Sequence, residues 1–150
     1  MVEKYTLDYC LKVLLADTVA MKFTAHGFHW NVEGPDFAQY HELFETIYVD
    51  VDSAIDPLAE NIRKLDCYVP FALQHFADLQ SVKPVTAKPN PLDMATVLFA
   101  MNDGLIKQID KAFKEATKAN EQGICNFLAD RDSQHKKWRW QLRSSIKGVK

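Results

Sequence analysis

Apolar side chains recur every three to four positions along four long stretches of this chain, which is the spacing of one face of an α-helix. The first stretch runs from Thr6 to His29 and the second from Asp36 to about Leu65. A third runs from Pro91 to Ala119, and a fourth from about Glu121 to Ile146. No stretch alternates apolar and polar residues with the period of a strand. The pattern therefore predicts an all-α chain with four long helices.

The links between these stretches carry turn-forming residues. A tight turn is predicted over 31–36, with Asp36 as the N-cap of the second helix. The longer link, 66–91, is typical of one or two helical turns followed by a proline-rich connection. Pro57 lies inside the second helix, and because proline removes a backbone hydrogen bond there, we expect a kink near Ser53. The expected fold is a four-helix bundle with a short helix in the connection between the second and third long helices.

Size and composition are those of one folded domain spanning residues 1–150. Hydrophobic residues make up 47% of the chain and charged residues 25%, a balance that excludes disorder. No apolar run approaches the roughly 20 residues that cross a bilayer, and the first ten residues do not resemble a signal peptide, so a cytoplasmic protein is predicted. Cys10, Cys67 and Cys125 are too far apart for a CxxC metal site and are predicted to be buried thiols.

Positive charge is concentrated near the C-terminal end. The chain has a net charge of -2. Residues 131–150, however, contain seven basic side chains and a single acidic one, Asp132, which gives this segment a net charge of +6. Basic residues favour the C-terminal end of a helix, so we interpret this first as compensation of the helix dipole. The alternative is a contact with an anionic partner.

Candidate metal ligands are concentrated in residues 26–60. His41 and Glu45 lie four residues apart, as do Asp56 and Glu60, so each pair shares one face of the second helix. The two pairs follow nearly the same stripe, but Glu45 and Asp56 are separated by about 16 Å along the helix axis. The two pairs of one chain therefore cannot hold the same ion.

A second copy of the chain removes this separation. If the second helices of two copies pack antiparallel about a two-fold axis near Asp50 and Val51, the acidic pair of each copy lies opposite the histidine and glutamate pair of the other. This arrangement gives two equivalent sites in a homodimer. His29 ends the first helix and can turn toward the same place. Imidazole combined with carboxylate suits iron, manganese or zinc better than calcium or magnesium. The alternative is that these side chains form an ordinary solvated helix face.

The same region carries a longer motif, which is matched by a second one in the last helix. The first reads His29-Trp30-Asn31-Val32-x-Gly34-x-x-Phe37-x-x-x-His41-x-x-Phe44-Glu45, followed by Asp56-x-x-Ala59-Glu60. The second reads His135-Lys136-Lys137-x-x-Trp140-x-Leu142-Arg143. Together they resemble the signature of the Dps family, the mini-ferritins of the ferritin-like superfamily, from the first helix to about Ile146.

This resemblance implies a dodecameric hollow cage with ferroxidase sites at its two-fold interfaces. Ferrous iron would be oxidised there, preferably by hydrogen peroxide, and stored as ferric mineral, which protects DNA and the cell from oxidative damage. Trp30 matches the aromatic residue beside the family's site, while Asp130 and Asp132 either line an iron-entry pore or are solvated acids. Zinc or manganese are further candidates for the same ligands. The residues that match the family's iron ligands, and so the predicted catalytic residues, are His29, His41, Glu45, Asp56 and Glu60.

Two departures from the family pattern bear on this site. Pro57 follows the matched ligand Asp56 and restricts its backbone, so we expect the half-site of Asp56 and Glu60 to be weaker than usual. Asn61 stands where the family commonly has an arginine, and Arg63 lies on another helix face.

DNA binding is predicted to be weak or absent. Family members that bind DNA usually do so through a lysine-rich terminal arm, whereas only Lys4, balanced by Glu3, precedes the first helix here, and the tail at 147–150 is short. The alternative is a DNA-binding and compacting cage with weak or impaired ferroxidase activity.

The remaining histidines and tryptophans carry separate expectations. His26 either supports the metal site from behind or serves as a capping or interface residue. His75 and His135 are predicted to be surface or interface residues. Trp138 and Trp140 lie two residues apart on one helix, so at most one faces the core. Trp140 matches the family and is assigned to the core, and Trp138 to a contact between subunits.

Overall fold

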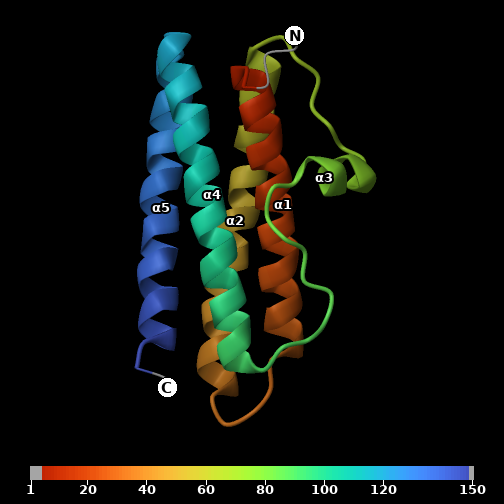
Figure 1. Cartoon of the computed structure of the whole chain (residues 1–150), viewed down its shortest axis with the longest axis vertical. Coiled ribbons are helices and arrows are strands. Elements are labelled where there is room, and N and C mark those ends of the chain that lie inside the picture. The colour runs from red at the N-terminus through yellow and green to blue at the C-terminus, as the bar shows by residue number, and fades with distance from the viewer. Residues whose placement is uncertain (1–4, 149–150) are drawn as a thin grey trace.

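The computed structural model describes residues 5–148, which form an all-α fold without strands (Figure 1). Glu3, Lys4 and Lys150, which entered the charge argument, lie outside these residues. None of the helices in the described part of the chain is long and apolar enough to cross a membrane. The helices are α1 (Leu7–Asn31), α2 (Phe37–Lys64), α3 (Leu73–Leu79), α4 (Pro91–Lys118) and α5 (Gln122–Ile146).

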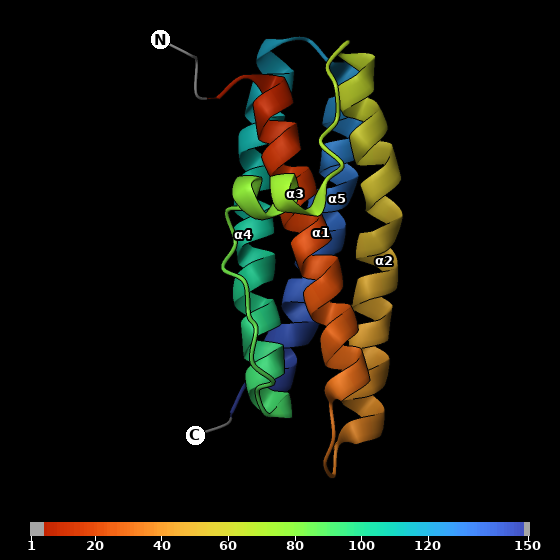
Figure 2. The ribbon, with the colours of Figure 1, turned by 90° about the vertical axis from the view of Figure 1, so that its right-hand side faces the viewer.

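Four long helices lie side by side, and the short α3 lies outside them against α1 (Figures 1 and 2). Neighbours α1 and α2 are antiparallel, as are α4 and α5. The connection from α2 to α4 runs the length of the bundle, so these two helices point the same way. The predicted four-helix bundle with a short helix in this connection is confirmed, and each long helix ends within two residues of its predicted limits.

The core is built from the apolar stripes that predicted the helices. One half of the bundle packs around Phe44, Met94 and Trp138, and the other around Leu11 and Ile109, all almost fully buried. Each such side chain contributes about 1.5–3 kcal/mol through removal of its apolar surface from water. This packing fixes the exposed faces of α1 and α2, on which the predicted ligands lie.

Local signals at the helix starts have mixed outcomes. Asn90 caps α4 as its side chain accepts a hydrogen bond from the Asp93 amide at 2.9 Å. Asp36 occupies the N-cap position of α2 as predicted, but its side chain makes no capping hydrogen bond. The turn depends instead on Gly34, whose φ of 120° is accessible mainly to glycine and whose carbonyl accepts from the Phe37 amide at 3.1 Å.

A buried carboxylate anchors the long connection to α1. Asp17 is fully buried and accepts hydrogen bonds from the Ser81 amide at 2.6 Å, the Ser81 hydroxyl at 2.5 Å and the Val82 amide at 3.1 Å. Burial raises the pKa of Asp17, and these donors act against the increase. Val82 in turn packs closely on Gly104 of α4. The chain that follows α3 is thereby pinned between two helices.

The cysteine prediction is only partly correct. Cys10 is buried, whereas Cys67 and Cys125 are half-buried, and all three are free thiols. The latter two lie near the end of α2 and the start of α5, where the core is less enclosed.

Candidate metal centre

His29 and His41 hold each other in place through their backbones. His29 lies in the last turn of α1 and His41 in the second turn of α2, and the short turn between the helices brings them together. The Nδ1 of His29 lies 2.8 Å from the carbonyl oxygen of His41. The Nδ1 of His41 lies 2.7 Å from the carbonyl oxygen of His29. Their rings stack with centroids 3.7 Å apart.

This arrangement selects the ring nitrogen that is available to a metal. A carbonyl oxygen only accepts hydrogen bonds, so each Nδ1 must carry a proton and donate it. In each neutral imidazole the lone pair then resides on Nε2. Backbone carbonyls commonly orient metal-binding histidines in this way. The hydrogen bonds thus leave Nε2 of each ring as the nitrogen that can bind a metal.

Glu45 completes a group of three with these histidines. It lies one turn after His41 on α2, and one ligand atom from each of His29, His41 and Glu45 lies within 4.8 Å of the others. Ligands bound at about 2.1 Å to one ion are about 3–4 Å apart, so small side-chain rotations suffice to close the set. Glu45 is exposed and the histidines are half-buried, which leaves the group open on one side.

Aromatic rings surround the two histidines. Phe37 stacks on His41 at 4.8 Å between centroids, and Tyr48 meets His29 edge-on at 5.2 Å. His26 stacks on Tyr48 and contacts Trp30, with both centroid distances 4.0 Å. These contacts restrict the rotamers of the ligand side chains without adding charge.

His26 supports the group from behind rather than joining it. Its Nδ1 is buried without a hydrogen-bond partner, and its ring centroid is 6.1 Å from that of His29. Burial lowers the pKa of His26, with Lys22 and His29 acting in the same direction and Asp52 against them. His26 therefore lies within the aromatic stack beside the group, and it makes no capping bond among the residues that the structure describes.

Asp56 and Glu60 are not part of this group. Both are exposed and lie further along α2, on the side that carries Glu45. Helix geometry puts Asp56 about 16 Å from Glu45 along the axis. The structure thus brings together three of the five predicted ligands within one chain and leaves two apart.

The residues that depart from the family pattern have distinct environments. α2 continues as one helix across Pro57, and just before it the Ser53 hydroxyl donates to the Asp50 carbonyl at 2.5 Å. Asn61 is buried, and its side-chain oxygen accepts from the Lys64 ammonium at 3.3 Å. Arg63 donates to the Cys67 carbonyl at 2.8 Å, so neither residue places a cation against Glu60 through a described contact.

A buried polar network joins α2, α4 and α5, and sequence reasoning missed it. Arg131 donates to both carboxylate oxygens of Asp50 at 3.0 Å, and the Trp138 indole donates to the same carboxylate at 2.7 Å. His135 bonds Asn102 through Nδ1 at 2.7 Å, and its Nε2 accepts from Arg131 at 3.2 Å. The i, i+4 spacing of Arg131 and His135 was the available signal in the sequence.

Two assignments on α5 were wrong. His135 was expected at the surface or an interface, but it is 1% exposed because Asn102 and Arg131 satisfy both of its ring nitrogens. Trp138 was expected at a subunit contact and Trp140 in the core, whereas Trp138 is 1% exposed and Trp140 57% exposed. Trp138 lies on the buried stripe of α5 with Leu128 and Leu142, and its indole donates to Asp50, whereas Trp140 points away from that stripe.

The network also shifts two pKa values. Burial lowers the pKa of His135 to about 3, with the Arg131 charge acting in the same direction. Burial alone would raise the pKa of Asp50, but hydrogen bonds from Arg131 and Trp138 hold it below its usual range. At neutral pH the network therefore contains one ion pair and a neutral histidine.

The comparisons with known proteins agree with the fold. Residues 10–150 match the family model of the ferritin-like domain. The chain is 30% identical to the DNA protection during starvation protein of Helicobacter pylori, over 91% of this chain and 95% of that protein.

Solved structures show the same likeness. The Dps of Thermosynechococcus elongatus superposes with a TM-score of 0.92 at 25% identity, covering 95% of this chain and 91% of that one. The Dps of Vibrio cholerae O1, described as a member of a broad superfamily of ferritin-like diiron-carboxylate proteins, gives a TM-score of 0.90 at 26% identity, with coverage of 94% and 89%.

Proposed function

Because the chain belongs to the ferritin-like family, and within it to the Dps proteins, we propose that it is a ferroxidase and iron-storage protein whose reaction sites are shared between two copies. The observation that carries this proposal is the group of His29, His41 and Glu45. Its two imidazoles bind ferrous iron, and its carboxylate favours the ferric product. Iron is the substrate of this site and, after oxidation, the stored product.

The second half of each site comes from another copy of the chain. Asp56 and Glu60 are exposed on the same side of α2 as Glu45, but too far along the helix to reach it. An antiparallel pairing of two α2 helices about a two-fold axis brings these acids opposite the histidines of the second copy. Val51 is buried in its own bundle, so the paired surface is the exposed side of α1 and α2 rather than the Val51 side. The two-fold axis therefore passes level with Asp50 and Val51 and not through their side chains.

The proposed reaction joins two ferrous ions with one molecule of hydrogen peroxide. Each ferrous ion gives one electron, the O–O bond breaks, and two protons complete two water molecules, leaving two ferric ions. Holding both ferrous ions at one shared site would let the two electrons reach the same peroxide molecule, which is then reduced to water rather than to a hydroxyl radical. The His29 and His41 rings keep their protons on Nδ1, donate them in hydrogen bonds to the two carbonyl oxygens, and act as ligands only. Binding of zinc or manganese by the same ligands stays a prediction.

We also propose the dodecameric cage as the assembly that stores the ferric product. Support comes from the ferritin-like family match and from the solved Dps structures that resemble this chain. Shared sites make oxidation depend on at least a dimer, and storage depends on the closed assembly.

DNA compaction is the less favoured function. Three of the basic side chains at the C-terminal end are used in ion pairs within the chain, Arg131 with Asp50, Lys136 with Asp132, and Arg139 with Asp103. This lowers the positive charge that is free for phosphate groups. The pairing of Asp132 with Lys136 favours a solvated acid over a pore residue.

A complementation experiment tests the shared site. His41→Ala and Glu60→Ala chains are made separately, and ferrous oxidation by hydrogen peroxide is followed without oxygen. Each variant alone should be inactive, because every site has lost a ligand. Dimers that contain one chain of each kind retain one intact site, so chains unfolded together and refolded should recover a substantial part of the natural rate. An Asp110→Ala chain, which changes an exposed carboxylate on α4, is the control and should keep the natural rate.

The outcomes separate the alternatives. No recovery in the mixture, with both single variants inactive, would place the complete site within one chain. Natural rates in both single variants would remove these ligands from the reaction altogether. DNA retention that persists at physiological salt would favour the compacting function instead.

A further inference from the structure

Six aromatic rings from α1 and α2 form one continuous row that passes through the metal group. In order along the row they belong to Trp30, His26, Tyr48, His29, His41 and Phe37. The centroids of neighbouring rings are 3.7–5.2 Å apart, so each ring contacts the next. We call these residues the ring row. Because only two of its members are predicted ligands, the row extends beyond the metal group on both sides.

Tyr48 is the member that joins the ligand His29 to the rest of the row. Its ring meets that of His29 edge-on, with centroids 5.2 Å apart and ring planes at 68°. It also stacks on His26, with centroids 4.0 Å apart and planes at 19°. The His26 ring is 6.1 Å from that of His29, so Tyr48 is the closer support of the ligand.

The hydrogen bond of His29 does not by itself fix the direction of its metal-binding nitrogen. That bond holds Nδ1 against the His41 carbonyl, and a hydrogen bond at a carbonyl oxygen tolerates a broad range of angles. The imidazole can therefore tilt about Nδ1, and a tilt displaces Nε2 on the far side of the ring. Stacking on the His41 ring limits part of this movement. The edge-on contact with Tyr48 limits the tilt in another direction.

Tyr48 and His26 hold their positions through their rings rather than their polar atoms. Among the described residues, no hydrogen bond of the Tyr48 hydroxyl accompanies its ring contacts. The Nδ1 of His26 is likewise buried without a hydrogen-bond partner. The His26 ring also contacts the Trp30 ring, at 4.0 Å between centroids, so it is held between two aromatic neighbours. The shape of these rings is therefore what reaches the ligand.

We propose that Tyr48 is a positioning residue for the ligand His29, and that His26 acts on that ligand only through Tyr48. His26 keeps the Tyr48 ring in place, and Tyr48 keeps the His29 imidazole from tilting away from the ion. This inference deepens the proposed function and rests on it only for the identity of the metal ligands.

Co²⁺ binding to the whole chain tests the proposal without using the oxidation reaction. Visible absorption gives the dissociation constant, and the positions of the Co²⁺ bands report how the ligands are arranged around the ion. Tyr48→Leu should weaken binding about 10-fold and shift the bands, because loss of an outer partner of a ligand costs 10–100-fold. His26→Leu should cause a smaller loss. Added to Tyr48→Leu, it should cause no further loss, because both changes act along one path.

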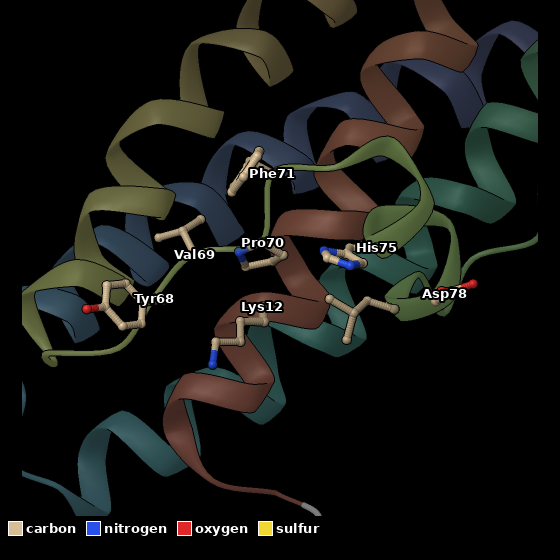
Figure 3. A pocket seen from close by; sticks show the side chains of 8 residues that line it. Lys12, Tyr68, Val69, Pro70, Phe71, His75 and Asp78 are labelled. Carbon is tan, nitrogen blue, oxygen red and sulfur yellow. The ribbon is translucent and has the colours of Figure 1, made fainter.

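Conservative variants and matched controls separate positioning from general damage. Tyr48→Phe and His26→Phe keep the rings and should restore the natural constant and bands. Tyr68→Leu and His75→Leu make the same substitutions at exposed residues around a hollow of about 440 Å³ beside α3 (Figure 3). Lys12 lines the same hollow and lies about 25 Å from His29 along the α1 axis. Both controls should bind Co²⁺ as the natural chain does.

Each outcome decides one part of the proposal. A natural constant and natural bands in Tyr48→Leu would overturn it, as would equal losses in Tyr48→Phe and Tyr48→Leu. Additive losses for His26→Leu and Tyr48→Leu would show that His26 acts by another path. Sedimentation velocity gives the assembly state of every variant, and weaker binding found only in chains that dissociate would also overturn positioning.

Failure of this inference is distinct from failure of the proposed function. A chain that shows the expected Co²⁺ dependences but does not oxidise ferrous iron would remove the ferroxidase function and leave the positioning role intact. A natural chain that binds no Co²⁺ would overturn both.

Discussion

His29 and His41 each donate a ring N–H to the other's backbone carbonyl, at 2.8 and 2.7 Å, so each residue fixes the tautomer of its neighbour. These two hydrogen bonds join the end of α1 to the start of α2 and therefore also close the turn between the helices. Changing either ring removes one ligand and the ring stacked on the other, whereas the backbone carbonyl that holds the remaining ring is kept.

A prediction follows for metal affinity. His41→Ala should weaken binding of Co²⁺, a spectroscopic substitute for Fe²⁺, by about 100-fold or more, because it removes a ligand itself, and loss of an outer partner of a ligand already costs 10–100-fold. His41→Gln keeps a donor near the His29 carbonyl and should lose less. Visible absorption of the Co²⁺ complex measures both constants. Equal losses in the two variants would show that a donor at position 41 to the His29 carbonyl contributes nothing to affinity.

Pro57 provides a second prediction. A proline lacks the amide that would donate to the Ser53 carbonyl, and it restricts the backbone of Asp56. Pro57→Ala should stabilise the chain by about 1–3 kcal/mol and tighten iron binding by the Asp56 and Glu60 half-site. Denaturant unfolding gives the free energy, and anaerobic ferrous titration gives the affinity. Unchanged iron affinity and oxidation rate would show that Asp56 is well placed despite the proline.

The helices were predictable because their signals are local. Periodic apolar residues and Pro91 at the start of α4 act within a few positions of themselves, and the structure ends each long helix close to its predicted limit. The grouping of His41 with Glu45 was predictable for the same reason, since one helical turn separates them. The reciprocal bonds of His29 and His41 were not, because they depend on how the turn at Gly34 orients two helix ends.

The interior of α5 was predicted incorrectly in part because the motif match outweighed the apolar spacing of the helix. Trp138 and Trp140 differ by about 200° around the helix, and Trp138 is the one that lies on the buried stripe with Leu128 and Leu142. The burial of His135 depends on a long-range partner, since Asn102, 33 residues earlier on another helix, pairs with it. That partner cannot be inferred from α5 alone.

His135 should make stability depend on pH. Its folded pKa is lowered to about 3 from an ordinary value of 6.5, so the folded chain keeps it neutral where the unfolded chain protonates it. The stability it contributes is complete above pH 6.5 and is lost as the pH falls toward 3, with a slope of at most about 1.4 kcal/mol per pH unit. His135→Gln should be less stable at pH 7.5, yet should lack this part of the slope.

Urea unfolding between pH 7.5 and 4.5, at one protein concentration, measures that slope. His75→Gln is the matched control, because His75 is exposed and the substitution is the same. If the free energy of unfolding depends on pH identically in the natural chain and in His135→Gln, protonation of the buried His135 does not destabilise the fold.

Gly104 and Val82 give the last prediction. A Cβ at Gly104 would lie 2.9 Å from Val82 Cγ1, closer than side-chain carbons approach. In a free helix, glycine to alanine stabilises by about 1 kcal/mol. Here Val82 cannot withdraw, since its amide donates to the buried Asp17 and its branched side chain has few rotamers. Gly104→Ala should therefore destabilise the chain by about 1 kcal/mol or more.

The double variant Gly104→Ala, Val82→Ala separates the contact from helix propensity. Val82→Ala removes the colliding methyl group, so in that background Gly104→Ala should become stabilising, and the two changes should couple by about 1–2 kcal/mol. Free energies of unfolding for the four chains of this cycle measure the coupling. Additive effects would show that the connection after α3 moves freely over α4, and that Asp17 does not hold it against the bundle.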